Sequence, residues 1–201
     1  MRNIVNEAFE TARRQALREG TPHEQSLMAA GRFWADAWLE EFVCDVAARY
    51  ALGRSFGYQH VRLCALLGGH LFEPELGQRS THPAHGARMR MVLAALHASG
   101  AVEDVVAVQE LWDRFAAHQL RARSPSYHLC YPDDLLDFVA TEVVQACRAI
   151  GITDSMTTRA RTGTVTEILL DAWARFLADS SSFGAWEEAS LAAMFHDSLS
   201  P

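Results

Sequence analysis

The chain is organised around the stretch TPHEQSLMAAGRFWADAWLEEFVCDVAARYAL, which runs from Thr21 to Leu52. It begins with Thr21-Pro22-His23-Glu24, the pattern of a capping box with proline in the first turn of a helix. No proline follows within the stretch. Apolar residues dominate from Phe33 to Leu52, as in a helix that is covered on most sides. The sequence therefore predicts one long helix over about residues 22–52.

Polar side chains on this helix form two short stripes at a spacing of four residues. The stripes are Arg32-Asp36-Glu40 and Glu41-Asp45-Arg49. At about 100° per residue, Glu40 and Glu41 point to different sides, so the exposed strip changes side halfway along the helix. Different neighbours are then expected to cover the two ends. We take this helix as the central one.

The rest of the chain repeats the helical spacing of apolar residues between breaks at glycine and proline. Further helices are predicted over 3–19, over 83–99, 102–121 and 132–150, from Thr164 to a break at Ser180, and over 183–196. After breaks at Gly53 and Gly57, a shorter helix that contains Val61, Cys64 and Leu67 is predicted to run to Gly68-Gly69. Residues 70–83, 123–131 and 151–163 are predicted loops. There is no strand pattern, internal repeat or low-complexity linker. The prediction is an all-α fold, with residues 1–201 in a single globular domain of seven to eight helices.

Composition indicates a soluble protein. The 201 residues are 49% hydrophobic and 21% charged, and the net charge is −7 with the basic residues scattered. Binding to nucleic acid or to a membrane surface is not expected, because both need clustered cations. The N-terminus lacks the apolar core of a signal peptide, and no segment is long enough to span a membrane. The four cysteines form no Cys-x-x-Cys pair and are expected to be buried free thiols in the cytoplasm.

All 18 basic residues are arginine, and the chain contains no lysine. Schiff-base chemistry and a Walker-type phosphate loop are excluded, since both need a lysine amine. Codon bias in a GC-rich genome is the favoured cause of the absence. Selection against lysine modification is the alternative, and the sequence does not decide between them.

The run Asp133-Asp134-Leu135-Leu136-Asp137 resembles the Asp-Asp-x-x-Asp motif of isoprenoid synthases, which are also all-helical. The resemblance covers this run only. It implies that Asp133, Asp134 and Asp137 hold Mg²⁺ ions that bind a diphosphate, since a hard cation takes several oxygen ligands. The favoured alternative is structural, because aspartates directly after Pro132 suit the positive end of a helix.

Histidine offers two further hypotheses. His82 and His85 lie three residues apart at a helix start, but zinc needs a third and usually a fourth ligand. The sequence has neither a His-Glu-x-x-His motif nor a cysteine pair to supply them. The segment Leu93-Ala94-Ala95-Leu96-His97 resembles the proximal-histidine segment of globins, which implies haem ligated by His97.

Residues 121–134 are predicted to form the main functional surface, because unusual polar and aromatic side chains concentrate there. The candidate ligand-binding residues are Arg121, Arg123, His128 and Tyr131. Arginine binds a carboxylate or phosphate through two parallel hydrogen bonds, so an anionic ligand is expected. Cys130 lies close to His128 and would be reactive if exposed. In the structural alternative, the two arginines pair with carboxylates of the following helix.

The leading function hypothesis is a non-enzymatic helical interaction or accessory protein, whose partner is a protein or a small anionic ligand. It rests on the lack of a complete catalytic constellation in the sequence. The alternative is a helical small-ligand-binding protein or enzyme, with haem at His97 or Mg²⁺-diphosphate at Asp133, Asp134 and Asp137. The sequence does not identify a cofactor, the oligomeric state, or whether the protein is an enzyme.

Overall fold

The computed structural model describes residues 1–68, 70–74, 76, 82–118, 126–155 and 164–198, and every regular element among them is a helix. Eight of these helices are longer than one turn: α1 (Arg2–Glu19), the continuous helix of α2 (Glu24–Phe33), η1 (Trp34–Trp38) and α3 (Leu39–Leu52), α4 (Arg54–Leu67), α5 (His85–Ala98), α6 (Val102–Ala117), α8 (Asp133–Ala149), α10 (Val165–Ala178) and α11 (Phe183–Ser198). A single turn, α7 (Tyr127–Cys130), lies before α8. The predicted all-α fold is confirmed.

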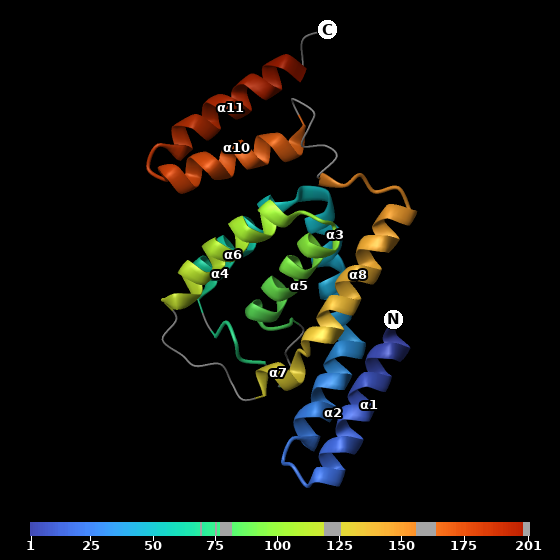
Figure 1. Cartoon of the computed structure of the whole chain (residues 1–201). Coiled ribbons are helices and arrows are strands. Elements are labelled where there is room, and N and C mark those ends of the chain that lie inside the picture. Colours follow the sequence, from blue (N-terminus) through green and yellow to red (C-terminus); the bar gives the residue numbers. More distant parts are fainter. Residues whose placement is uncertain (69, 75, 77–81, 119–125, 156–163, 199–201) are drawn as a thin grey trace.

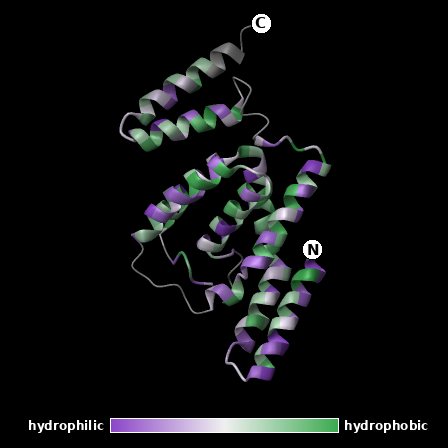
Figure 2. Ribbon diagram, in the orientation of Figure 1, coloured by the Kyte–Doolittle hydropathy of each residue, from purple (hydrophilic) through white to green (hydrophobic). Residues whose placement is uncertain are grey.

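The helices pack in four groups (Figure 1). α1 and α2 form an antiparallel pair, α3, α5 and α8 pack against one another, and α4 packs against α6. α10 and α11 form a hairpin that contacts α4 through α10. Hydrophobic and hydrophilic residues alternate along the helices, as expected where one side of each is covered (Figure 2). None of the described helices combines the length and apolarity needed to cross a membrane.

The predicted central helix is continuous from Glu24 to Leu52, with the π-helical turn η1 in its middle. A π turn holds more residues than an α turn, so it rotates the faces of the helix that follows. The turn ends at Trp38, two residues before Glu40, and the polar strip changes side between Glu40 and Glu41. α2 contacts α1 and α7, whereas α3 contacts α4, α5 and α8, so different neighbours do cover the two ends.

Two details predicted for this helix are wrong. The hydroxyl of Thr21 donates to the carbonyl of Ala16 at 3.4 Å, at the end of α1, and does not cap α2. The second polar stripe is not exposed, since Asp45 and Arg49 are 3% and 0% exposed. Both side chains are covered because α5 and the residue after it, Ser99, pack over this side of α3.

α5 shares the central position, because it contacts α3, α4, α6 and α8. Ala87, Met91 and Ala95 belong to the larger hydrophobic cluster, with residues of α1, α2, α3 and α8. Met89, Val92 and Leu96 belong to a second cluster, with residues of α4 and α6. Each set repeats at helical spacing, so α5 lies between the two hydrophobic clusters and contributes one face to each.

Aromatic rings fill the larger cluster around the π turn. Trp34 and Trp38 are fully buried, as predicted. The Trp38 ring stacks on Phe33 at a centroid distance of 5.2 Å and contacts Tyr131 at 4.9 Å. All four cysteines are free thiols, but only three are buried, because Cys44 lies on an exposed side of α3.

Candidate metal centre

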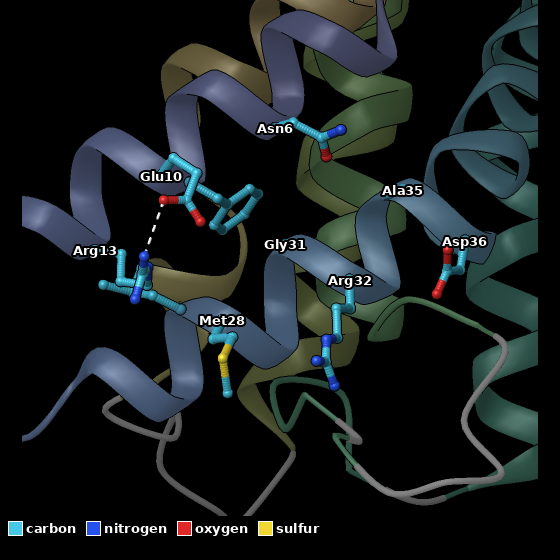
Figure 3. A pocket seen from close by; sticks show the side chains of 10 residues that line it. Asn6, Glu10, Arg13, Met28, Gly31, Arg32, Ala35 and Asp36 are labelled. Atoms are coloured by element: carbon cyan, nitrogen blue, oxygen red, sulfur yellow. Dashed lines mark hydrogen bonds and ion pairs between the residues drawn. The ribbon is translucent and has the colours of Figure 1, made fainter.

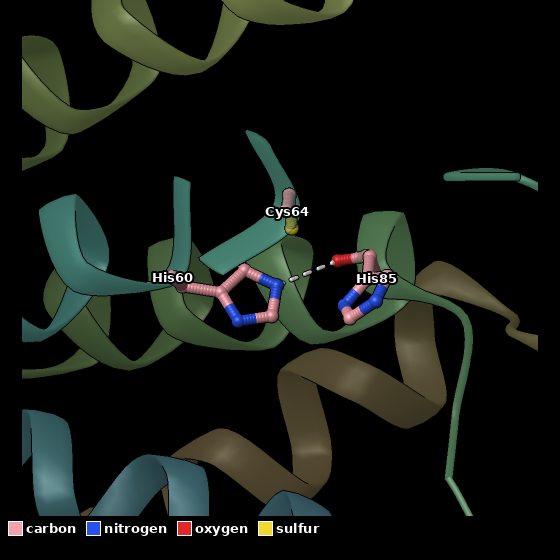
Figure 4. A group of neighbouring side chains, drawn as sticks. All are labelled: His60, Cys64 and His85. Atoms are coloured by element: carbon pink, nitrogen blue, oxygen red, sulfur yellow. Dashed lines mark hydrogen bonds between the residues drawn. The ribbon is translucent and has the colours of Figure 1, made fainter. Parts of the chain in front are cut away.

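α4 and α5 bring together three side chains that can ligate a metal ion. His60 and Cys64 lie one turn apart on α4 and therefore share a face of the helix. His85 is the first residue of α5. One donor atom from each residue lies within 4.8 Å of the other two (Figure 4). We call these residues the His60–Cys64–His85 cluster.

Backbone hydrogen bonds fix the start of α5 and with it the position of His85. The Gly86 N–H donates to the carbonyl of Leu71 at 2.8 Å. The Ala84 N–H donates to the hydroxyl of Tyr131 at 2.9 Å. The start of the helix is thus tied both to the preceding segment and to the residue that follows α7.

The ring of His60 is oriented by a hydrogen bond. Its Nε2 lies 3.1 Å from the carbonyl oxygen of His85. Because a carbonyl can only accept, Nε2 carries the proton and Nδ1 carries the lone pair. Figure 4 shows Nε2 on the side of the ring that faces Cys64 and His85. An ion held by all three residues would therefore replace this hydrogen bond.

Burial keeps two members of the cluster uncharged. His60 and Cys64 are 3% and 1% exposed. Burial lowers the pKa of His60 to about 4, with the nearby charge of Arg88 as a second cause, so its imidazole is neutral at pH 7. Burial also raises the pKa of the Cys64 thiol to about 12. Cys64 is therefore not a nucleophilic thiolate by itself, but a thiol that coordinates an ion releases its proton to solvent and binds as the thiolate.

The donor set fits soft and borderline metal ions. Imidazole and thiolate suit Zn²⁺ and copper, whereas Mg²⁺ and Ca²⁺ prefer oxygen ligands. A tetrahedral ion with ligand distances of about 2.0–2.3 Å holds its donors roughly 3.5 Å apart. Donor atoms that are up to 4.8 Å apart would have to approach one another by about an ångström to bind one ion. The three residues can thus form a three-ligand site.

A pocket of about 360 Å³ lies beside the cluster and shares His85 with it. Its lining is Leu63, Leu67, His70, Glu73, His82, Pro83, Ala84, His85 and Arg88. The side chains of His70 and His82 are 40% and 65% exposed, so they are accessible from solvent. We call this the histidine-lined pocket.

The residues of the predicted 121–134 surface do not share one environment. Arg121 and Arg123 lie outside the described residues. His128 is exposed, whereas Tyr131 is fully buried, and its hydroxyl holds the start of α5. Cys130 is buried as well, and burial raises its pKa to about 12, so a reactive thiol in this segment is ruled out.

Asp133, Asp134 and Asp137 are exposed in the first two turns of α8, after the N-cap residue Pro132. Asp133 forms an ion pair with Arg90 of α5. A Mg²⁺ ion bound there would compete with this guanidinium. His97 is exposed near the end of α5. The Mg²⁺ and haem hypotheses stay predictions.

Two further pockets flank α1. The first has a volume of about 530 Å³ between α1 and the continuous helix α2–η1. Charged side chains line it, and Arg13 pairs there with Glu10 at 3.1 Å (Figure 3). The second has a volume of about 420 Å³ and is mainly apolar. Its lining is Ile4, Ala8, Phe9, Ala12, Leu27, His128, Leu129, Pro132, Asp134, Leu135 and Phe138.

No known protein family, curated protein or solved structure matches the chain. Sequence reasoning missed the cluster, although part of its signal was visible. His60 and Cys64 have the spacing of four residues that places two ligands on one helical face. The third ligand, His85, is brought to them only by the packing of α4 against α5.

Proposed function

We propose that this protein is a helical metal-binding accessory protein, in which His60, Cys64 and His85 hold one Zn²⁺ or Cu⁺ ion. The observation that carries the proposal is the approach of the three donor atoms to within 4.8 Å in a largely buried site. Two neutral imidazoles and one thiolate are a donor set that these ions favour.

A bound ion would join α4 to α5, since each helix supplies a ligand. Because folding assembles the site, binding would stabilise the folded chain. Three protein ligands also leave one coordination position open for water or for an external ligand. The proposed role is thus to carry an ion whose fourth position can be exchanged.

The test is a titration of the purified protein, first treated with a chelator, with Co²⁺ as an optical substitute for Zn²⁺. Cu⁺ is titrated in parallel against a chromophoric chelator. We expect one equivalent of metal to bind, with a thiolate-to-cobalt charge-transfer band and a rise in melting temperature. Cys64→Ser should remove the band and lower the affinity at least tenfold, since it removes one of three ligands.

Cys147→Ser is the matched control, because Cys147 is also a buried free thiol, on α8. It should keep the band, the stoichiometry and the affinity of the wild type. The proposal would be wrong if the wild type bound less than one equivalent. It would also be wrong if Cys64→Ser bound Co²⁺ as well as Cys147→Ser.

The pocket of about 420 Å³ supports binding of a small apolar molecule as a second candidate function. Its size and apolar lining are typical of ligand pockets. Phe9 lines it, and the Phe9 ring lies 6.2 Å from the ring of Trp34. Titration with medium-chain alcohols should therefore change tryptophan fluorescence. Phe138→Arg should abolish the change, and an equal response of this variant would exclude the pocket.

Cytoplasmic location is part of the proposal, and the four free thiols support a reducing compartment. A protein or small anionic partner is still expected, with Arg121 and Arg123 as its candidate contacts. Its test is salt dependence, because binding through exposed arginines weakens as ionic strength rises. An unchanged affinity from low to high salt would exclude this mode of binding.

A further inference from the structure

We propose that the histidine-lined pocket is the route by which a metal ion reaches the His60–Cys64–His85 cluster, with His70 and His82 as transient ligands on the way. This inference rests on the proposed metal-binding function. It adds two residues that belong to neither the final ligand set nor the hydrophobic core.

Burial makes a route necessary. His60 and Cys64 are almost completely covered, so a hydrated ion cannot reach them directly from solvent. His85 is partly exposed and lines the pocket as well as belonging to the cluster. An ion that enters the pocket therefore meets His85 first among the three final ligands.

Ligands of suitable chemistry lie in front of His85. His70 and His82 line the same pocket, and both side chains are well exposed. Each has a carboxylate beside it, because His70 Nδ1 lies 3.7 Å from Glu73 and His82 Nδ1 lies 3.2 Å from Glu41. Imidazoles exchange onto a metal ion in place of water, and the carboxylates attract a cation to the opening.

Arg88 is the one arginine in the lining of this pocket, and its permanent positive charge would oppose a cation. Its guanidinium lies 2.6 Å from Asp45 and 3.7 Å from Glu41. These two carboxylates offset its positive charge. The electrostatic balance of the pocket therefore does not exclude a cation.

Transfer along the route is a sequence of ligand exchanges without a change of oxidation state. The imidazole of His82 or His70 first replaces a water ligand of the ion. His85 then replaces that imidazole, and His60 binds the ion next. When the bond from the metal to sulfur forms, the S–H bond of Cys64 breaks and its proton leaves to solvent through the pocket. Three protein ligands and one external ligand then hold the ion.

The test measures association and dissociation of Co²⁺ by stopped-flow absorbance with the full chain. The test variant is His70→Ala with His82→Ala. The control is His23→Ala with His118→Ala, which removes two histidines that lie outside the pocket. We expect the test variant to slow association and dissociation at least fivefold, with an equilibrium affinity within twofold of the wild type. The control should keep both rates.

Rates of the test variant equal to those of the control would overturn the inference. A loss of equilibrium affinity equal to the loss of association rate would overturn it too, since His70 and His82 would then be permanent ligands. Failure of the metal-binding function itself has a different signature: the wild type would not bind one equivalent of Co²⁺. Glu73→Gln should slow association at low salt only, because screening weakens long-range attraction.

Discussion

Arg88 on α5 donates two hydrogen bonds to Asp45 on α3, from Nε at 2.8 Å and from Nη2 at 2.6 Å. Asp45 is 3% exposed, and burial raises the pKa of its carboxyl even though Arg88 acts to lower it. Burial also acts to lower the pKa of Arg88, but the hydrogen bond to Asp45 raises it above its ordinary value. The two helices are thus joined by a largely buried ion pair. Arg88 lies one turn after His85, so this ion pair also helps to place the candidate metal site.

The first prediction concerns this pair. Asp45→Ala should lower the free energy of unfolding by about 3 kcal/mol, because Arg88 is left largely buried without its main partner. Glu40→Ala is the control on the same helix, since its ion pair with Arg2 is 69% and 59% exposed. It should change stability by about 1 kcal/mol or less. Chemical denaturation measures the stability of both variants. Equal losses would show that the Asp45–Arg88 pair contributes no more to stability than an exposed ion pair.

The second prediction separates packing from hydrogen bonding at the π turn. Trp34 Nε1 donates to the carbonyl of Cys130 at 2.8 Å, whereas Trp38 Nε1 has no partner among the described residues. Both rings are fully buried, so Trp34→Phe and Trp38→Phe should both cost packing energy. Trp34→Phe should cost about 1 kcal/mol more, because it also leaves a buried carbonyl without a donor. Urea denaturation checks the order, and a larger loss for Trp38→Phe would contradict it.

The positions of the helices were predictable, because apolar spacing and the breaks at glycine and proline are local features. The burial of Asp45 and Arg49 was not. Periodicity within one helix assigns every polar stripe to solvent, yet the exposure of a stripe depends on which side chains of other helices pack against it. Here Arg88 and Ser99 come from more than 35 residues away in sequence, with hydrogen-bond separations of 43 and 50 residues. Partners so distant in the sequence cannot be inferred from the spacing of residues within one helix.

The candidate site shows the same limit. The spacing of His60 and Cys64 is a local signal, but their third partner becomes visible only in the packed structure. Tyr131 is the opposite case. Its place among polar loop residues predicted a role on the surface, whereas its ring and hydroxyl serve the core.

The third prediction compares two threonines that the sequence presents as identical helix caps. The run Thr164-Val165-Thr166-Glu167 has the same capping-box spacing as Thr21 to Glu24. Thr164 Oγ1 accepts a hydrogen bond from the Glu167 N–H at 3.3 Å, as this spacing predicts. Thr164→Ala should therefore lower stability by about 1 kcal/mol. Thr21→Ala removes only a hydroxyl that donates to a carbonyl at 3.4 Å and should cost less. Thermal melting of both variants is the measurement, and the reverse order would restore Thr21 as a cap.

The fourth prediction tests the aspartates of α8. Asp133→Asn with Asp137→Asn should lower the free energy of unfolding by about 0.6–2 kcal/mol, because each of the two contacts with the helix dipole contributes about 0.3–1 kcal/mol. Under this structural role, Mg²⁺ with pyrophosphate leaves the melting temperature of the wild type unchanged. If Mg²⁺ with pyrophosphate raised the melting temperature of the wild type and not that of the double variant, the resemblance to isoprenoid synthases would extend to function.

The last prediction concerns pH and the buried imidazole of His60. Its pKa falls from an ordinary 6.5 to about 4 on folding, so the unfolded chain binds a proton that the folded chain excludes. Stability from this group is present above pH 6.5 and is lost as pH falls toward 4. Between pH 7 and 5 the loss should be about 2 kcal/mol.

His60→Gln should lack that part of the acid sensitivity, whereas His97→Gln, which changes an exposed residue, should keep it. Urea denaturation at both pH values, with a chelator present, is the measurement. Equal acid sensitivity of the wild type and His60→Gln would mean that His60 accepts a proton as readily in the folded protein as in the unfolded chain.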